Sequence, residues 1–136
     1  AAGGCVIQAH PFRVRDYLRA IRVCERYADG IEVANAGNLP VQDAYAARYA
    51  KVNGLYTIAG SDNHRSHEGS RLFGVGLDDR LDSSADWVAH VLQRKPLTLL
   101  CPEDHFDADI SNPPELPAFW MNEQDEFVPM DMGWLK

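Results

Sequence analysis

Cysteine is scarce in this chain of 136 residues, and its placement excludes two common uses. The three cysteines, Cys5, Cys24 and Cys101, are odd in number and far apart. They therefore match neither a disulfide framework nor a Cys-x-x-Cys metal site. Reduced thiols in the core of a cytoplasmic protein fit them better, and we expect a cytoplasmic location.

Long apolar runs and an excess of positive charge are also missing. No run approaches the roughly 18 residues that a membrane span requires, and the first residues lack the basic and apolar regions of a signal peptide. Thirteen Lys and Arg against 20 Asp and Glu give a net charge of -7, which disfavours binding along a nucleic acid. We expect neither a membrane nor a nucleic acid as partner; a small phosphorylated substrate held by local arginines stays compatible with this charge.

What the sequence does contain is an alternation of strand and helix patterns. Apolar runs predict strands near residues 5–9, 31–34, 55–59 and 97–100, and helical spacing predicts helices over 15–28, 41–52 and 85–94. Such alternation is typical of an α/β fold with parallel strands and helical crossovers. The length and the hydrophobic share of 46% suffice for a real core.

Residues 102–136 differ in character from the rest. They are rich in proline and acidic residues, and proline density argues against regular elements. We expect two parts, a barrel portion over 1–101 and a Pro-rich acidic tail over 102–136 that packs on the domain or on a partner. The alternative is that its aromatic residues make it an oligomerisation or partner-binding arm.

Metal-type side chains follow two of the predicted strands. Asp62 and His64 come directly after the run 55–59, and His10 comes directly after the run 5–9. Carboxylate and imidazole are ligands for Zn, Mn or Fe. A lone Asp-x-His is more typical of a solvated turn, but its repetition at two strand ends favours a site, since α/β barrels build their sites there.

These motifs resemble a known family. Ala9-His10-Pro11, the strand 31–35 and Gly60-Ser61-Asp62-Asn63-His64 are similar, in order and spacing, to motifs of the polymerase and histidinol phosphatase (PHP) family of metal-dependent phosphoesterases. The resemblance implies a distorted (β/α)7 barrel, up to three divalent ions (Zn, Mn or Fe) and hydrolysis of a small phosphorylated substrate. It also implies that His10, Asp62 and His64 each serve a different metal.

One part of the family pattern is absent. The His-x-His strand that opens the family, and the further His and Glu ligands that follow it, do not occur before His10. The chain therefore resembles the C-terminal half of a PHP barrel, whose open edge requires the missing N-terminal half or self-association. We expect the isolated chain to be weakly active or inactive. A noncatalytic metal-binding or interaction half-domain is one alternative, and a PHP-type nuclease, disfavoured by the acidic charge, is another.

Other polar residues near the motifs are candidates for supporting roles. Arg13 and Arg65 each follow a ligand motif and offer guanidinium groups for phosphate oxygens, with an exposed arginine as the alternative. Glu32, inside a predicted strand, is a candidate for orienting a ligand histidine, and Asn35 for contacting substrate. We expect His67 to be a solvated loop histidine, with a polar contact near the site as the alternative, and His90 and His105 to be structural or solvated.

Overall fold

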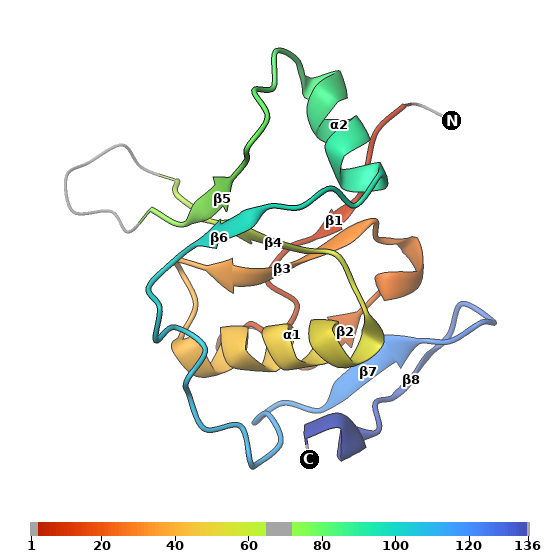
Figure 1. Cartoon of the computed structure of the whole chain (residues 1–136). Coiled ribbons are helices and arrows are strands. Elements are labelled where there is room, and N and C mark those ends of the chain that lie inside the picture. Colours follow the sequence, from red (N-terminus) through yellow and green to blue (C-terminus); the bar gives the residue numbers. More distant parts are fainter. Residues whose placement is uncertain (1–2, 65–71, 136) are drawn as a thin grey trace.

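A parallel three-stranded sheet forms the centre of the computed structural model, which describes residues 3–64 and 72–135 (Figure 1). Its strands lie in the order β1 (Ile7–Gln8), β3 (Gly30–Asn35) and β4 (Thr57–Gly60). All six residues of β3 are buried, as expected for the middle strand of a covered parallel sheet. Three of the four predicted strands and their parallel pairing are thus confirmed.

The helix α1 (Pro40–Asn53) covers one face of this sheet, below β3 in Figure 1. Pro40 stands at the start of the helix, where its missing N–H costs no hydrogen bond. Gly54 ends it with a φ of 61°, a conformation that glycine adopts without a side-chain clash. Local sequence signals of this kind explain why the prediction of a helix over 41–52 is confirmed.

The helix predicted over residues 15–28 is wrong. The segment instead contains a strand, β2 (Ile21–Val23), and one short turn of 3₁₀ helix, η1 (Glu25–Tyr27). Ile21 and Val23 are buried while Arg22 between them is exposed, which is the alternation of a strand rather than a helical stripe. β2 pairs in parallel with a strand from the other end of the chain, and this distant partner overrides the local helical spacing.

The late strand also departs from the prediction. β6 (Thr98–Leu100) exists, but it pairs antiparallel with β5 (Gly74–Gly76) in a separate two-stranded sheet that lies beside β4. It is therefore not a parallel strand of the central sheet. Between β5 and β6 runs α2 (Ser84–Leu92), and Ser83 and Asp86 exchange hydrogen bonds that cap its start.

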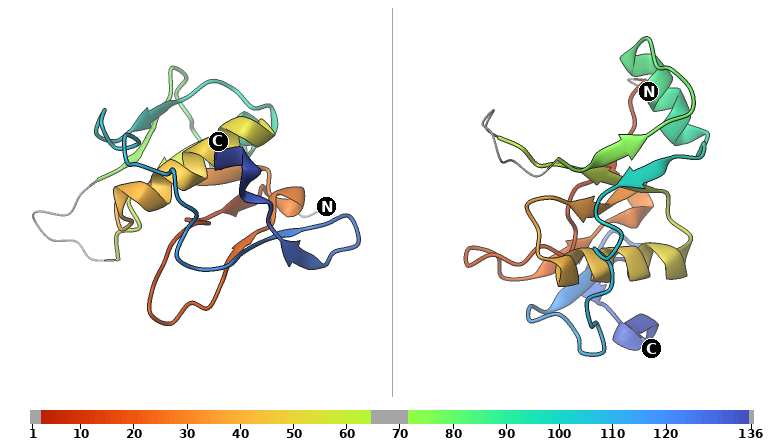
Figure 2. Two further views of the ribbon diagram at one scale, coloured as in Figure 1. Left: turned by 90° about the horizontal axis from the view of Figure 1, so that it is seen from below. Right: turned by 60° about the vertical axis from the view of Figure 1, so that its left-hand side comes forward.

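The segment after Cys101 is more regular than its prolines predict. It contains two strands, β7 (Ala118–Met121) and β8 (Phe127–Pro129), and a final 3₁₀ turn, η2 (Met132–Leu135). The three-stranded sheet β2-β7-β8 lies on the far side of α1 from β5 and β6, as the two views of Figure 2 show. Pro129 fits a strand because β8 is at the edge of its sheet. The segment therefore packs on the rest of the chain.

The core fills the space between the central sheet, α1 and the C-terminal segment. It is built around rings, with Phe12 5.7 Å from Tyr49 and 5.6 Å from Trp134 between centroids. The fold is thus mixed α/β with mostly parallel pairing, and the described residues form three separate sheets rather than a closed barrel. No helix in the described ranges is long and apolar enough to cross a membrane.

Candidate functional site

The carboxyl ends of β1, β3 and β4 bring the predicted site residues together. His10 follows β1 by two residues, Asn35 ends β3, and Asp62 follows β4 by two residues. Because these strands are adjacent and parallel, their ends meet at one edge of the sheet, where open α/β sheets bind ligands. Arg13, three residues after His10, joins them through its long side chain.

Arg13 is the residue that ties this cluster together. Its Nη2 lies 2.6 Å from Asp62 Oδ2 and also donates to Asn35 Oδ1 at 2.7 Å. Its Nε donates to Asn38 Oδ1 at 2.6 Å. With only 10% of its side chain exposed, the guanidinium is held in one orientation by charge-assisted bonds. The alternative of a freely exposed arginine is therefore excluded for Arg13.

The charge of Asp62 is stabilised by its neighbours. Burial works to raise the pKa of this carboxyl group, but the hydrogen bond and the positive charge of Arg13 outweigh burial, and the net pKa lies below its usual value. His10 and His64 act in the same direction. His64 Nε2 lies 3.2 Å from Asp62 Oδ1, and its side chain is 85% exposed. Asp62 thus presents an ionised carboxylate at the surface of the sheet edge.

Glu32 lies beneath the cluster rather than at its surface. Its Oε2 accepts hydrogen bonds from the backbone N–H of His10 at 2.7 Å and from Asn35 Nδ2 at 2.9 Å. It therefore positions the backbone of His10, whereas the sequence suggested contact with the ligand ring. A Cβ added at Gly60 would lie 2.5 Å from Glu32 Oε1, so a larger residue at position 60 would force the hydrogen-bonded Glu32 carboxylate to move.

Two candidate ligands have unusual backbone conformations. His10 has a φ of 31° and Asp62 a φ of 50°, values that few residues other than glycine adopt, although Asp and His are enriched among those that do. Such conformations persist where the surroundings fix them, and they cluster at functional sites. Here the hydrogen bond that the His10 backbone N–H donates to Glu32 and the ion pair between Arg13 and Asp62 supply that restraint.

A second set of polar contacts holds Asn35 and Asn38, the partners of Arg13, and no motif in the sequence indicated it. Asp43, 1% exposed, accepts from the backbone N–H of Asn35 at 2.7 Å and from Asn38 Nδ2 at 2.6 Å. Its Oδ2 also lies 2.7 Å from His105 Nε2. We call these four residues the Asp43 cluster (Asn35, Asn38, Asp43 and His105). His105 is buried, so of the two expected roles, structural or solvated, the structural one is correct.

The predicted metal ligands meet few further donor groups among the described residues. Asp62 and His64 offer suitable donor atoms, but one oxygen of Asp62 faces Arg13. Over residues 3–64 and 72–135, no group of three or more His, Cys, Asp and Glu side chains is arranged to hold a metal ion. Since catalytic metals usually take at least three protein ligands, a resident ion would need further ligands from outside this set. Arg65 and His67 lie outside the described residues.

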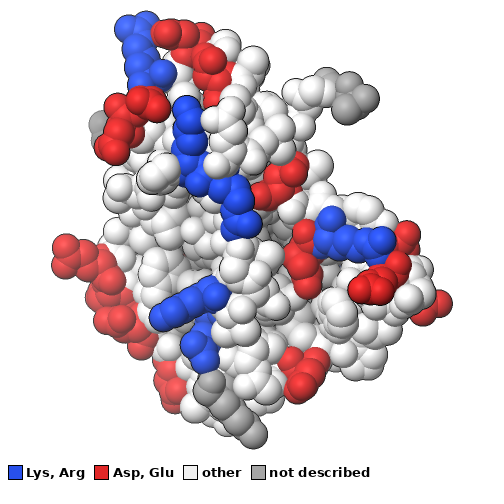
Figure 3. Space-filling model, turned by 45° about the vertical axis from the view of Figure 1, so that its right-hand side comes forward, with Lys and Arg blue, Asp and Glu red and all other residues white. Residues whose placement is uncertain are grey.

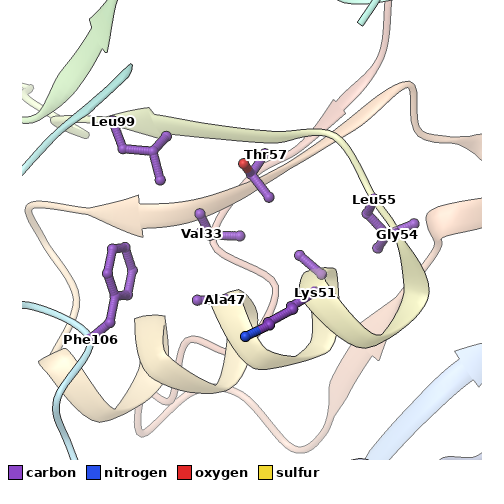
Figure 4. Close-up of a pocket in the computed structure, with 9 residues that line it drawn as sticks. Val33, Ala47, Lys51, Gly54, Leu55, Thr57, Leu99 and Phe106 are labelled. Carbon is purple, nitrogen blue, oxygen red and sulfur yellow. The ribbon is translucent and has the colours of Figure 1, made fainter. Parts of the chain in front are cut away.

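Two larger cavities lie away from the predicted site residues. One of about 400 Å³ opens between α1, β3, β4 and β6, and Val33, Leu55, Leu99 and Phe106 give it an apolar lining (Figure 4). A hollow of about 750 Å³ borders His105 and Cys101. On the face drawn in Figure 3, Lys and Arg form small groups separated by neutral and acidic side chains, so this face offers no extended basic surface to a polyanion.

Comparison with known proteins adds no relative to this description. No family model, curated protein or solved structure matches the chain.

Proposed function

We propose that the chain is part of a metal-dependent phosphoesterase of the PHP type, acting on a small phosphorylated substrate, with its site at the edge formed by the carboxyl ends of β1, β3 and β4. One observation carries the proposal. His10, Arg13, Asn35 and Asp62, from three separate segments, converge at that edge. The motif order that resembles the PHP family supplies the reaction class.

In this proposal Arg13 binds the phosphate group. Its guanidinium is planar and held by Asn35, Asn38 and Asp62, so it meets a phosphate oxygen without losing side-chain freedom at the moment of binding. Its positive charge stabilises the negative charge that develops on the phosphoryl oxygens in the transition state. Asp62 has a different role in this proposal, that of a metal ligand. Its lowered pKa keeps the carboxylate ionised at neutral pH and into the acid range.

His10, Asp62 and His64 are the residues that would contribute to holding divalent ions, together with ligands from the missing barrel strands. Bound divalent ions supply a hydroxide near neutral pH and polarise the phosphoryl oxygen. The chain's own contribution is to orient these side chains. Glu32 fixes the backbone of His10, and Arg13 fixes Asp62.

A noncatalytic metal-binding or interaction half-domain is the second candidate. It is favoured by one observation, that the described residues contain no group of three metal-type side chains in position to bind an ion. Both candidates place His10, Asp62 and His64 at the same site, and they differ in whether completion of the site yields turnover.

The deciding experiment is reconstitution. The isolated chain should hydrolyse p-nitrophenyl phosphate barely above background with Mn²⁺ or Zn²⁺, because the His-x-His strand is absent. Fusion to, or mixing with, a PHP N-terminal half that carries His-x-His should restore turnover. Asp62→Ala or His10→Ala in the reconstituted protein should abolish it.

Arg13→Ala supplies a control that separates the roles. It should raise the KM for phosphoester while the reconstituted protein still binds metal, because the proposed role of Arg13 is to bind phosphate and Arg13 is not itself a metal ligand. A reconstituted protein that binds metal and hydrolyses no phosphoester would favour the half-domain. Strong turnover by the isolated chain would refute the incomplete site.

A further inference from the structure

A small cavity lies beside the C-terminal half of α1 and is bordered by η1 and by the C-terminal segment. It has a volume of about 240 Å³, which suits a ligand smaller than the drug-sized molecules that larger pockets hold. Its lining combines acidic and aromatic side chains, and six residues matter to the argument: Glu25, Tyr49, Trp120, Met130, Asp131 and Trp134.

The carboxylate of Glu25 is the first unusual feature of this cavity. Its Oε1 accepts a hydrogen bond from Tyr49 Oη at 2.6 Å. Its Oε2 is shielded from solvent and accepts no hydrogen bond from the described residues, and none of their ion pairs involves Glu25. A desolvated carboxylate without a counter-charge is costly, and its attraction for a nearby cation is stronger than in water because the surroundings have a low dielectric.

The aromatic side chains are the second feature. Tyr49 and Trp134 meet edge to face, with 5.4 Å between their centroids, and Trp120 adds a partly exposed indole, 38% exposed, to the lining. Trp and Tyr rings attract cations through their π electrons, and sets of such rings with a carboxylate bind quaternary ammonium groups. Asp131, also in the lining, adds a second negative charge.

The third feature is that Arg48, a cation on α1, is already bonded to another group. Arg48, on α1, donates its Nε to the backbone carbonyl of Trp134 at 2.9 Å, so this guanidinium is used in holding η2 against the helix. The indole Nε1 of Trp134 has no hydrogen-bond partner among the described residues. Both Glu25 Oε2 and Trp134 Nε1 are shielded from solvent, so a ligand in the cavity would be attracted by the charge of Glu25 across a short distance rather than by a direct hydrogen bond.

We infer that this cavity binds a small organic cation of the alkylammonium class. The cation supplies the counter-charge for Glu25 and contacts the rings of Tyr49, Trp120 and Trp134. The site is separate from the cluster around Arg13 and Asp62, and it does not depend on the proposed phosphoesterase activity.

Choline and its neutral isostere 3,3-dimethyl-1-butanol are the matched probes, because they share shape and hydroxyl and differ in charge. Binding to the full chain is measured by tryptophan fluorescence and by calorimetry. Choline should bind at least about tenfold more tightly than the isostere, the difference expected from cation–π and carboxylate attraction. Equal affinities, or no choline binding up to about 10 mM, would overturn the inference.

Variants locate the site. Glu25→Gln keeps the acceptor for Tyr49 and removes the charge, and it should weaken choline binding by about tenfold. Glu123→Gln makes the same change on an exposed residue of the β7–β8 turn and should leave binding unchanged. Trp120→Leu should weaken choline more than the isostere. If both glutamate variants reduced binding alike, the effect would be one of net charge and the assignment would be wrong.

Discussion

Replacement of Asp43 by alanine tests the buried support of the site. Asp43 accepts from the Asn35 backbone N–H, from Asn38 Nδ2 and from His105 Nε2, at 2.6–2.7 Å, and is 1% exposed. Each buried donor left without a partner costs about 1–3 kcal/mol. Three such costs do not add fully, because water and side chains adjust, so we expect Asp43→Ala to lower the free energy of unfolding by about 3–5 kcal/mol.

Urea unfolding followed by circular dichroism measures this loss directly. Asp16→Ala is the matched control, since Asp16 is exposed and the described contact to it uses only its backbone carbonyl. Its effect should stay within about 0.5 kcal/mol. Asp43→Asn, which keeps one oxygen acceptor, should fall between the two. If Asp43→Ala cost less than about 1 kcal/mol, the three contacts would not stabilise the fold and the reasoning would fail.

Three further predictions concern Arg13, Asp62 and Gly60 at the candidate site. Arg13→Ala should raise the pKa of Asp62, because the group that lowers it is lost while burial remains; carboxyl-carbon NMR titration measures this, and an unchanged pKa would contradict it. The lowered pKa means that Asp62 stabilises the fold above the unfolded value of about 3.9, and that this contribution is lost as the pH falls through the folded pKa. Asp62→Asn should therefore flatten the dependence of stability on pH below about 4, and an unaltered acid-unfolding profile would count against the ion pair. Gly60→Ala should destabilise the protein by about 1–3 kcal/mol, because the new Cβ meets Glu32 Oε1; unchanged thermal unfolding would show that Glu32 moves freely.

Local signals in the sequence predicted the elements that depend on few distant contacts. Pro40 and Gly54 bound α1, and Ser83 with Asp86 caps the start of α2. β2 was missed because its partner, β7, lies near the other end of the chain. The direction of β6 was misjudged because a short apolar run carries no information on whether its neighbour is parallel or antiparallel.

The residues of the candidate site were also predictable only where local sequence signals placed them. His10 and Asp62 were identifiable because each follows a predicted strand, and the parallel pairing then places them at one edge. Asp43 was missed because an acidic residue in a first helical turn is commonly a surface residue that favours the helix dipole. One of its partners is His105, which comes from the C-terminal segment. No periodicity in the sequence links Asp43 to His105.

Metal binding tests the central claim most directly. The isolated chain is dialysed against Zn²⁺ or Mn²⁺ and its metal content is measured by elemental analysis, alongside Asp62→Ala and the exposed control Asp16→Ala. If His10, Asp62 and His64 form part of a metal site, the wild-type chain and the Asp16 variant should retain the same amount, less than one ion per chain because ligands are missing. The Asp62 variant should then retain none. Equal metal content in all three proteins would contradict the assignment.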